Sequence, residues 1–218
     1  MLPDWPAQYI RWKWKPGQVD LGKKATVKSE LLVLPFASQS KWADWLAKQH
    51  DKSMGLWLKL AKKDTGIASV TYEEALDIAL CYGWIDGQKK GFDEKFWLQK
   101  FTPRGPKSIW SKINTEKVER LISDGKMKPA GLKAIEAAKA DGRWAQAYAS
   151  QKNISISEDF QAALDKNKKA KTFFATLKSS ERYSFLFRIQ TAKKAETRAR
   201  RIQQFVEMLE RNEKLHLL

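Results

Sequence analysis

Near residue 114 the chain changes from mixed strand and helix patterns to helical patterns alone. Before that point, short alternating runs such as LWLKL at 56–60 are separated by turns, which is typical of strands. After it, apolar residues recur at helical spacing, as in the final stripe of Ile202, Phe205 and Leu209. The change predicts an α+β fold: a small antiparallel sheet with packed helices, followed by a helical C-terminal region.

Capping residues set the predicted boundaries of the elements before residue 114. Thr71 and Glu74 have the spacing of a capping box in front of an apolar run, and Gly83 follows where a left-handed C-cap is expected. Ser38 is placed to cap an earlier helix. The prediction for this part is strands over 30–36, 56–60, 84–88 and 95–101 and helices over 38–50 and 71–82.

Similar residues divide the rest of the chain into helices. Asn114 or Thr115 is predicted to cap the first, and Pro129 suits the first position of the second, which Gly142 ends. Ser157 is predicted to cap the helix after that. Further helices are predicted to begin near residues 168 and 180, and the last contains the stripe at 202–209.

The elements fall into three predicted parts. Prolines and glycines make residues 1–28 an irregular N-terminal arm. An α+β domain is expected at 29–148 and a helical C-terminal region at 157–218, with a linker at 149–156 between them. With 43% hydrophobic residues, the chain has enough apolar material to bury a core.

The chain carries a formal net charge of +16, spread along its 218 residues. Such a balance favours anionic partners, among them nucleic acid, acidic membrane surfaces and phosphorylated ligands. The alternative is a solvated basic surface with no partner of its own. No run is long and apolar enough to cross a bilayer, and no export signal is recognisable, so a cytoplasmic protein without a transmembrane segment is expected.

Cysteine and histidine are too few for a metal site of the usual kind. Cys81 is the single cysteine and has mostly apolar neighbours, so a buried, inert thiol is expected. His50 and His216 are far apart in sequence, which leaves no zinc-ligand spacing. Neither a cofactor nor a metal ion is predicted, and the familiar phosphate-loop and nucleophile-elbow motifs are absent from the sequence.

The run from 82 to 114 combines tryptophans with cationic side chains, which favours stacking and anion attraction. Asp86 follows Trp84 and is either a general base or a turn aspartate bonded to nearby backbone N–H groups. Arg104 has the planar guanidinium fork that suits phosphate or carboxylate. The alternative is that Arg104 pairs with an acid such as Asp86.

Polar side chains follow Arg104 at a spacing of three residues, at Ser108, Ser111 and Asn114, with Trp110 among them. On a helical turn this spacing presents donors on one side, and backbone N–H groups at the helix start would add to an anion site. The same residues suit a capping network, because helix starts need such partners in any case. Both interpretations stay open.

A third cluster lies in the C-terminal region. Lys193, Arg198 and Arg201 form its basic surface, and the two arginines are neighbours on a helix because they are three residues apart. They would either clamp phosphate groups or form a solvated face opposite the apolar stripe at 202–209.

Four blocks carry a family resemblance: ALCYGWIDG (79–87), FTPRGPKSIWSKIN (101–114), GKMKPAGLKAIEAAKADGRW (125–144) and ETRARRIQQFVEMLERNEKLH (196–216). Through them, residues 31–216 resemble the YdeI/OmpD-associated (OmdA-like) bacteriocin-protection family. The resemblance implies resistance to bacteriocins or cationic antimicrobial peptides and association with an outer-membrane porin; its label suggests a periplasmic location. It also implies a shared site at Trp84, Asp86, Gly87, Thr102, Pro103, Arg104, Ser108, Trp110, Ser111 and Asn114.

Three functions are weighed from these observations. The first is a stress or antimicrobial-protection type of protein whose basic, aromatic surface binds an anionic ligand, either nucleic acid or a phosphorylated or carboxylated small molecule. The second is a protein-interaction scaffold that docks a protein partner through the C-terminal helices. The third is an enzyme of unassigned class that uses Asp86 and Arg104. The sequence favours binding, and no catalytic residue is assigned.

Overall fold

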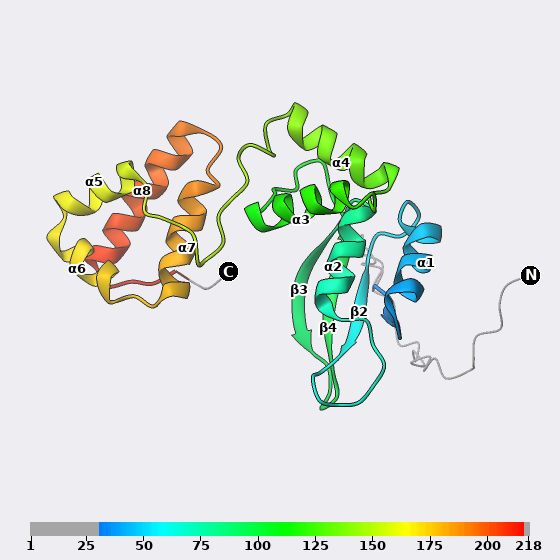
Figure 1. The fold of residues 1–218 in the computed structure, drawn as a ribbon. Helices are drawn as coiled ribbons and strands as arrows, with labels where there is room; N and C mark the ends of the chain where they lie inside the picture. The colour runs from blue at the N-terminus through cyan, green and yellow to red at the C-terminus, as the bar shows by residue number, and fades with distance from the viewer. Residues whose placement is uncertain (1–30, 216–218) are drawn as a thin grey trace, which may run out of the picture. The chain divides into compact units, whose positions relative to one another are not determined.

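The structure, a computed structural model, describes residues 31–215 (Figure 1). Four strands form one sheet in the order β1-β2-β4-β3. They are β1 (Val33–Pro35), β2 (Leu56–Ala61), β3 (Trp84–Gly91) and β4 (Phe96–Pro103). The predicted N-terminal arm at 1–28, together with Glu30 and His216, lies outside the described residues.

The sheet is mixed rather than wholly antiparallel. β4 pairs antiparallel with both β2 and β3, whereas β1 runs parallel to β2 with Val33 opposite Trp57. The parallel pair arises because helix α1 (Gln39–Gln49) connects β1 to β2 and returns the chain to the same end of the sheet. The predicted α+β class with C-terminal helices is confirmed, and the parallel edge strand corrects the predicted sheet.

Most helix boundaries agree with the predicted capping residues. The Thr71 capping box is formed, Gly83 has a φ of +73°, and Pro129 begins a helix. After α1, the described part of the chain contains the helices α2 (Tyr72–Cys81), α3 (Lys112–Ser123), α4 (Pro129–Ala140), α5 (Glu158–Lys166), α6 (Lys168–Thr176), α7 (Ser179–Gln190) and α8 (Ala195–Glu210).

Helix α3 begins earlier than predicted. Ser111 has extended backbone angles, and its hydroxyl accepts a hydrogen bond from the Asn114 backbone N–H at 3.2 Å. Ser111 is therefore the N-cap, and the prediction that Asn114 or Thr115 caps this helix is wrong. Thr115 lies within the first turn, where its hydroxyl donates to the Lys112 carbonyl at 2.8 Å.

Helices α1 and α2 bury an aromatic core against one face of the sheet, and α2 lies across that face in Figure 1. Two buried indoles anchor this core. Trp42 Nε1 donates to the Ala75 carbonyl and Trp84 Nε1 donates to the His50 carbonyl, each at 3.0 Å. The first bond joins α1 to α2 and the second joins β3 to the end of α1. A buried indole N–H without an acceptor would cost free energy.

A second apolar core lies among α5 to α8. Phe160, Phe174, Phe185 and Phe205 pack edge to face, with ring centroids 5.3 to 6.3 Å apart. The first core is built from residues 36–147 and the second from residues 160–209; the exact domain boundaries stay predictions. In the described range, no helix has both the length and the apolar character needed to span a bilayer, and no cluster of acidic, histidine or cysteine side chains is arranged to hold a metal ion.

Gly131 on α4 lies against the backbone at the end of α2. A Cβ at this position would lie 2.3 Å from the Cys81 carbonyl oxygen and 2.6 Å from Met127 Cε, so a larger residue does not fit. Lys128 N–H donates to the same carbonyl at 3.1 Å and fixes the start of α4 there. The predicted burial of the Cys81 thiol is confirmed, and burial raises its pKa to about 11.

We expect Gly131→Ala to lower the free energy of unfolding, although alanine is the better helix former by ~1 kcal/mol. The clash is with backbone, and overpacking of this kind costs ~1–3 kcal/mol. The control is Gly105→Ala, where the nearest atom to the added Cβ is Ser108 Oγ at 3.9 Å. Urea unfolding measures both variants, and a Gly131→Ala variant as stable as the control would contradict the close approach.

Candidate functional site

Arg104 follows β4 and lies among polar side chains that are distant in sequence. Its backbone N–H donates to the Gly83 carbonyl at 2.9 Å, which fixes it beside the start of β3. Its guanidinium carbon lies 3.5 Å from the centroid of the Trp110 ring, a close cation–π contact. Electrostatic interactions and hydrogen bonds link it with the side chains that we call the Arg104 cluster: Tyr72, Asp86, Arg104, Trp110, Arg143 and Tyr148.

The Arg104 guanidinium makes one hydrogen bond, and two of its three nitrogen atoms have no acceptor. Nη1 donates to the Ile109 carbonyl at 3.2 Å. Nε and Nη2 are buried and have no hydrogen-bond partner in the described part of the chain. Trp110 is 2% exposed, and its Nε1 is likewise buried without an acceptor there. Buried N–H groups are normally paired, so three unpaired donors on two stacked side chains mark this place as unusual.

The environment of Arg104 is unfavourable for its charge. Burial lowers the pKa of Arg104 to about 10, and the nearby charge of Arg143 acts in the same direction, whereas Tyr148 and Asp86 oppose them. The group is still charged at neutral pH. The folded state therefore holds a desolvated cation whose hydrogen bonds are incomplete, and this costs free energy.

Asp86 is engaged by a tyrosine rather than by Arg104. Tyr72 Oη donates to the Asp86 carboxylate at 2.8 Å. The alternative in which Asp86 pairs with Arg104 does not form, because Nη1 bonds Ile109 and the other two nitrogens have no partner among residues 31–215. Burial, and then the Asp86 charge, raise the pKa values of both Tyr72 and Tyr148, so both phenols are protonated donors at neutral pH.

The segment after α4 brings Arg143 and Tyr148 to the cluster. Tyr148 N–H donates to the Trp110 carbonyl at 2.9 Å, which aligns the segment with the residues before α3. Arg143 Nε contacts the two Asp141 oxygens at 2.8 and 2.7 Å, and its Nη1 donates to the Ser108 carbonyl at 2.8 Å. Arg143 is 8% exposed and more deeply buried than Arg104, which is half-buried, but the charge of Arg143 is paired and it holds the loop in place.

Three of the seven predicted ligand-binding side chains have structural roles, and a fourth residue, Asn114, contributes its backbone N–H. Trp84 is 1% exposed in the first core, so it is not at the surface. Ser108 Oγ accepts the Gly105 N–H at 3.0 Å, and Ser111 caps α3 through the Asn114 N–H. Both serine hydroxyls accept hydrogen bonds from backbone N–H groups. They therefore fit the predicted capping network better than the predicted row of donors facing an anion.

The other three predicted residues, Asp86, Arg104 and Trp110, lie together in the Arg104 cluster. Tyr72, Arg143 and Tyr148 were not predicted as site residues. Tyr72 is the first residue of α2, and the other two follow α4. These three residues reach the Arg104 cluster only through the tertiary fold. No motif or spacing in the sequence indicates that they lie close to Arg104.

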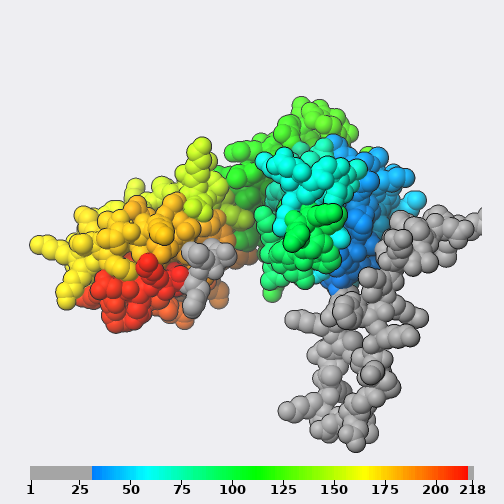
Figure 2. Space-filling model, turned by 90° about the horizontal axis from the view of Figure 1, so that it is seen from below, coloured from blue at the N-terminus to red at the C-terminus, as the bar shows by residue number. Residues whose placement is uncertain are grey.

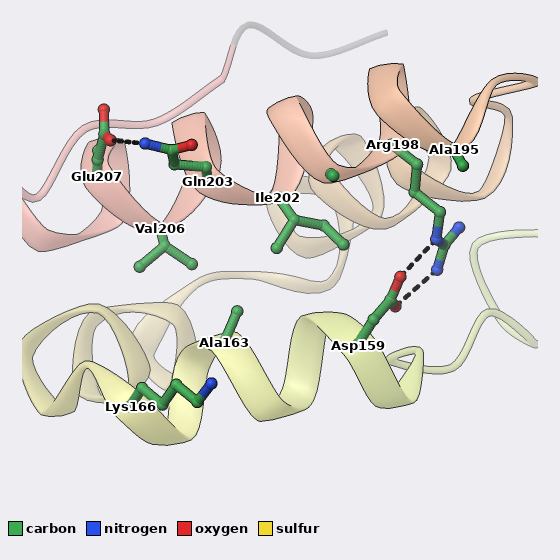
Figure 3. A pocket seen from close by; sticks show the side chains of 10 residues that line it. Asp159, Ala163, Lys166, Ala195, Arg198, Ile202, Gln203, Val206 and Glu207 are labelled. Atoms are coloured by element: carbon green, nitrogen blue, oxygen red, sulfur yellow. Dashed lines mark hydrogen bonds and ion pairs between the residues drawn. The ribbon is translucent and has the colours of Figure 1, made fainter.

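The predicted basic surface at Lys193, Arg198 and Arg201 is used mainly for internal contacts. Arg198 Nε and Nη2 donate to the two oxygens of Asp159 at 2.6 and 2.7 Å (Figure 3). Arg201 donates to the Arg188 carbonyl, and Lys193 is exposed. Arg198 thus joins α8 to α5 and Arg201 joins α8 to α7, whereas the exposed Lys193 is compatible with the solvated face.

A groove runs between α5 and α8 beside the Arg198–Asp159 pair (Figure 3). Ala163, Ile202 and Val206 give its wall a mostly apolar character.

Comparison with protein families divides the chain in two. Residues 153–212 match the family described as Bacteriocin-protection, YdeI or OmpD-Associated. The predicted family resemblance is confirmed over these residues. The description of that family names a role in bacteriocin protection.

Residues 34–134, which hold the sheet and most of the Arg104 cluster, match a separate family described as Domain of unknown function (DUF8412). The OmdA match is therefore narrower than the predicted resemblance over 31–216. No curated protein and no solved structure matches the chain.

We expect the Asp159–Arg198 pair to make stability depend on pH. Hydrogen bonds from Arg198 lower the pKa of Asp159 below its usual value, so the stabilisation is present above about pH 4 and is lost as the pH falls through the lowered pKa. The Asp159 side chain is 47% exposed, so its loss in Asp159→Asn should cost only ~1 kcal/mol near pH 7. The difference from wild type in urea unfolding should shrink at pH 3, whereas Glu158→Gln, one residue away, should show no such trend.

We expect Arg104→Met to leave the free energy of unfolding unchanged or to raise it by ~1–2 kcal/mol, because the variant removes a desolvated and partly unpaired cation. It also removes the Ile109 hydrogen bond and the contact with Trp110, which act in the opposite direction. Urea unfolding at pH 7 decides between these effects. A loss above ~2 kcal/mol would make Arg104 a structural residue, as we expect for Arg143→Met.

Proposed function

We propose that this protein performs its bacteriocin-protection type of role by binding a small anionic ligand at the Arg104 cluster. The observation that carries the proposal is the group of three buried donors without acceptors, Nε and Nη2 of Arg104 and Nε1 of Trp110. A carboxylate or phosphate supplies acceptors and negative charge together, and so would offset both the missing hydrogen bonds and the desolvated charge.

The unpaired edge of Arg104 has the geometry for a two-point contact. Nε and Nη2 lie on one edge of the guanidinium plane and form parallel hydrogen bonds with a carboxylate or phosphate. The same protein uses this edge at Arg198, where Nε and Nη2 bind the two oxygens of Asp159. In Arg104 the equivalent edge is directed at no acid of the described residues.

The neighbours of Arg104 favour an anion that also carries a hydrogen-bond donor. Asp86 accepts from Tyr72 and, as a carboxylate, has further acceptor capacity. A ligand with one acidic group and one hydroxyl or amino group would meet Arg104 with the first and Asp86 with the second. Because Asp86 is already hydrogen-bonded by a protonated phenol, binding is favoured over general-base catalysis.

The charge of the chain argues against direct capture of cationic peptides. A net charge of +16 repels such peptides at long range. Protection through a bound anion avoids this conflict. The interaction-scaffold alternative is supported by a different observation, the mostly apolar groove between α5 and α8.

Native mass spectrometry of the purified full chain tests the proposal. We expect a co-purifying small anion in the wild type, its loss in Arg104→Met, and its retention in Arg200→Met, a control with the same charge change on α8. Thermal shift with inorganic phosphate, acetate and citrate provides a second readout, since a ligand of the folded state raises Tm by mass action. Equal shifts in both variants would assign the effect to general charge screening and reject the site.

A further inference from the structure

The face of the sheet turned away from α1 and α2 carries lysines that lie over aromatic rings. Side chains alternate along a strand, so Trp57 and Lys59 point away from the core into which the leucines of β2 project. Leu98 on β4 is opposite Lys59 on one side and Lys90 on the other, and residues directly opposite each other point to the same face. Leu98 and Lys90 therefore share this second face with Trp57 and Lys59. The lysine–aromatic face comprises Trp57, Lys59, Lys90, Phe92, Phe96 and Lys100.

The lysine ammonium groups sit directly on the rings. Lys59 Nζ lies 4.4 Å from the centroid of Phe92 and 4.0 Å from that of Phe96. Lys90 Nζ reaches across β4 to within 4.2 Å of the Trp57 centroid. Leu98 between them is only 2% exposed, although it is not part of the helix-covered core. Lysine stems and aromatic rings therefore cover this face.

The surroundings of the face are strongly cationic. Segments 57–64 and 88–100 contain seven lysines and three acidic residues. Lys59 meets Asp93 only at 4.0 Å. The turn between β3 and β4 lies at the surface beside the residues that follow β2 (Figure 2), and the Lys62 N–H donates to the Lys95 carbonyl at 2.8 Å. Positive charge and ring faces are thus presented together across three strands.

We propose that the lysine–aromatic face binds single-stranded nucleic acid. An unpaired base that stacks on the Trp57 or Phe96 ring takes the place of the lysine ammonium, and stacking of a base is the stronger of the two interactions. The displaced ammonium then lies beside the phosphate of the same nucleotide. Lys59 and Lys90 flank β4, two strand spacings or about 10 Å apart, and Lys100 lies on β4 between them, so the three lysines can follow a phosphate backbone laid across the sheet.

This ligand is favoured over the other polyanions. A duplex hides its base faces, so the rings would contribute nothing and only the lysines would act. A small anion contacts one lysine and not a series across strands. An acidic membrane uses the charge, but of the rings on this face only Phe92, at 50% exposure, is among the large apolar side chains that project into solvent. The site is separate from the Arg104 cluster and does not depend on the proposed function.

Fluorescence anisotropy with a labelled single-stranded 12-mer of uridine tests the proposal on the full chain. The variant is Lys59→Gln/Lys90→Gln, and the control is Lys168→Gln/Lys169→Gln, which removes the same charge from exposed positions on α6. We expect about tenfold weaker binding for the variant at 50 mM salt and a salt slope shallower by about 1.4, since each phosphate contact to a single strand contributes about 0.7. The control should change neither value.

Phe92→Ala gives an independent test that does not rely on charge. Because Phe92 lies half exposed in the hairpin turn, its loss should leave the melting temperature unchanged while weakening binding of the 12-mer at least threefold. We also expect the single strand to bind at least fivefold tighter than a duplex of equal length. The proposal is overturned by no binding at 50 mM salt, by equal losses in variant and control, or by binding of phosphatidylserine vesicles that the 12-mer does not displace.

Discussion

Helix α4 approaches the end of α2 because neither Gly131 nor Gly83 has a side chain. A Cβ on Gly83 would lie 2.9 Å from the Ala130 carbonyl oxygen, and its positive φ of +73° is itself unfavourable for other residues. The Gly83 carbonyl then accepts the Arg104 N–H. The turn at Gly83 therefore lets α4 pack close to α2 and also fixes the position of Arg104, the central residue of the Arg104 cluster. The chain that leaves α4 reaches Trp110 within eight residues, through the bond from Tyr148.

Arg143, which is buried, and Arg104, which is half-buried, show what folding alone would favour. Arg143 has its charge met by Asp141 and a carbonyl, as expected for a residue kept for stability. Arg104 has a comparable position but an incomplete set of partners. A fold optimised only for stability would pair or replace such a group, and this is the reason why we propose a ligand for it.

Local rules predicted the elements well and the cluster poorly. The Thr71 capping box, Gly83 and Pro129 act within one or two turns, so the sequence shows them directly. The start of α3 was misplaced because several polar residues there could each cap a helix, and the choice of Ser111 depends on the bridge that pairs it with Tyr148. Tyr72 and Tyr148 were missed for the same reason, since only the tertiary fold brings them to Asp86.

Charge in the sequence did not reveal which cations are committed to the fold. Arg198 stood out in a basic run, yet both nitrogens of its Nε/Nη2 edge are bound to Asp159, and its Nη1 donates to the Ile189 carbonyl. Lys59 and Lys90 stood in ordinary alternating strands, yet they lie on aromatic rings. The difference is set by what stands across the strand or helix from each cation. Asp159 binds Arg198 at hydrogen-bonding distance, whereas Lys59 and Lys90 lie over rings, and the proposed exchange for a stacked base and a phosphate rests on this difference.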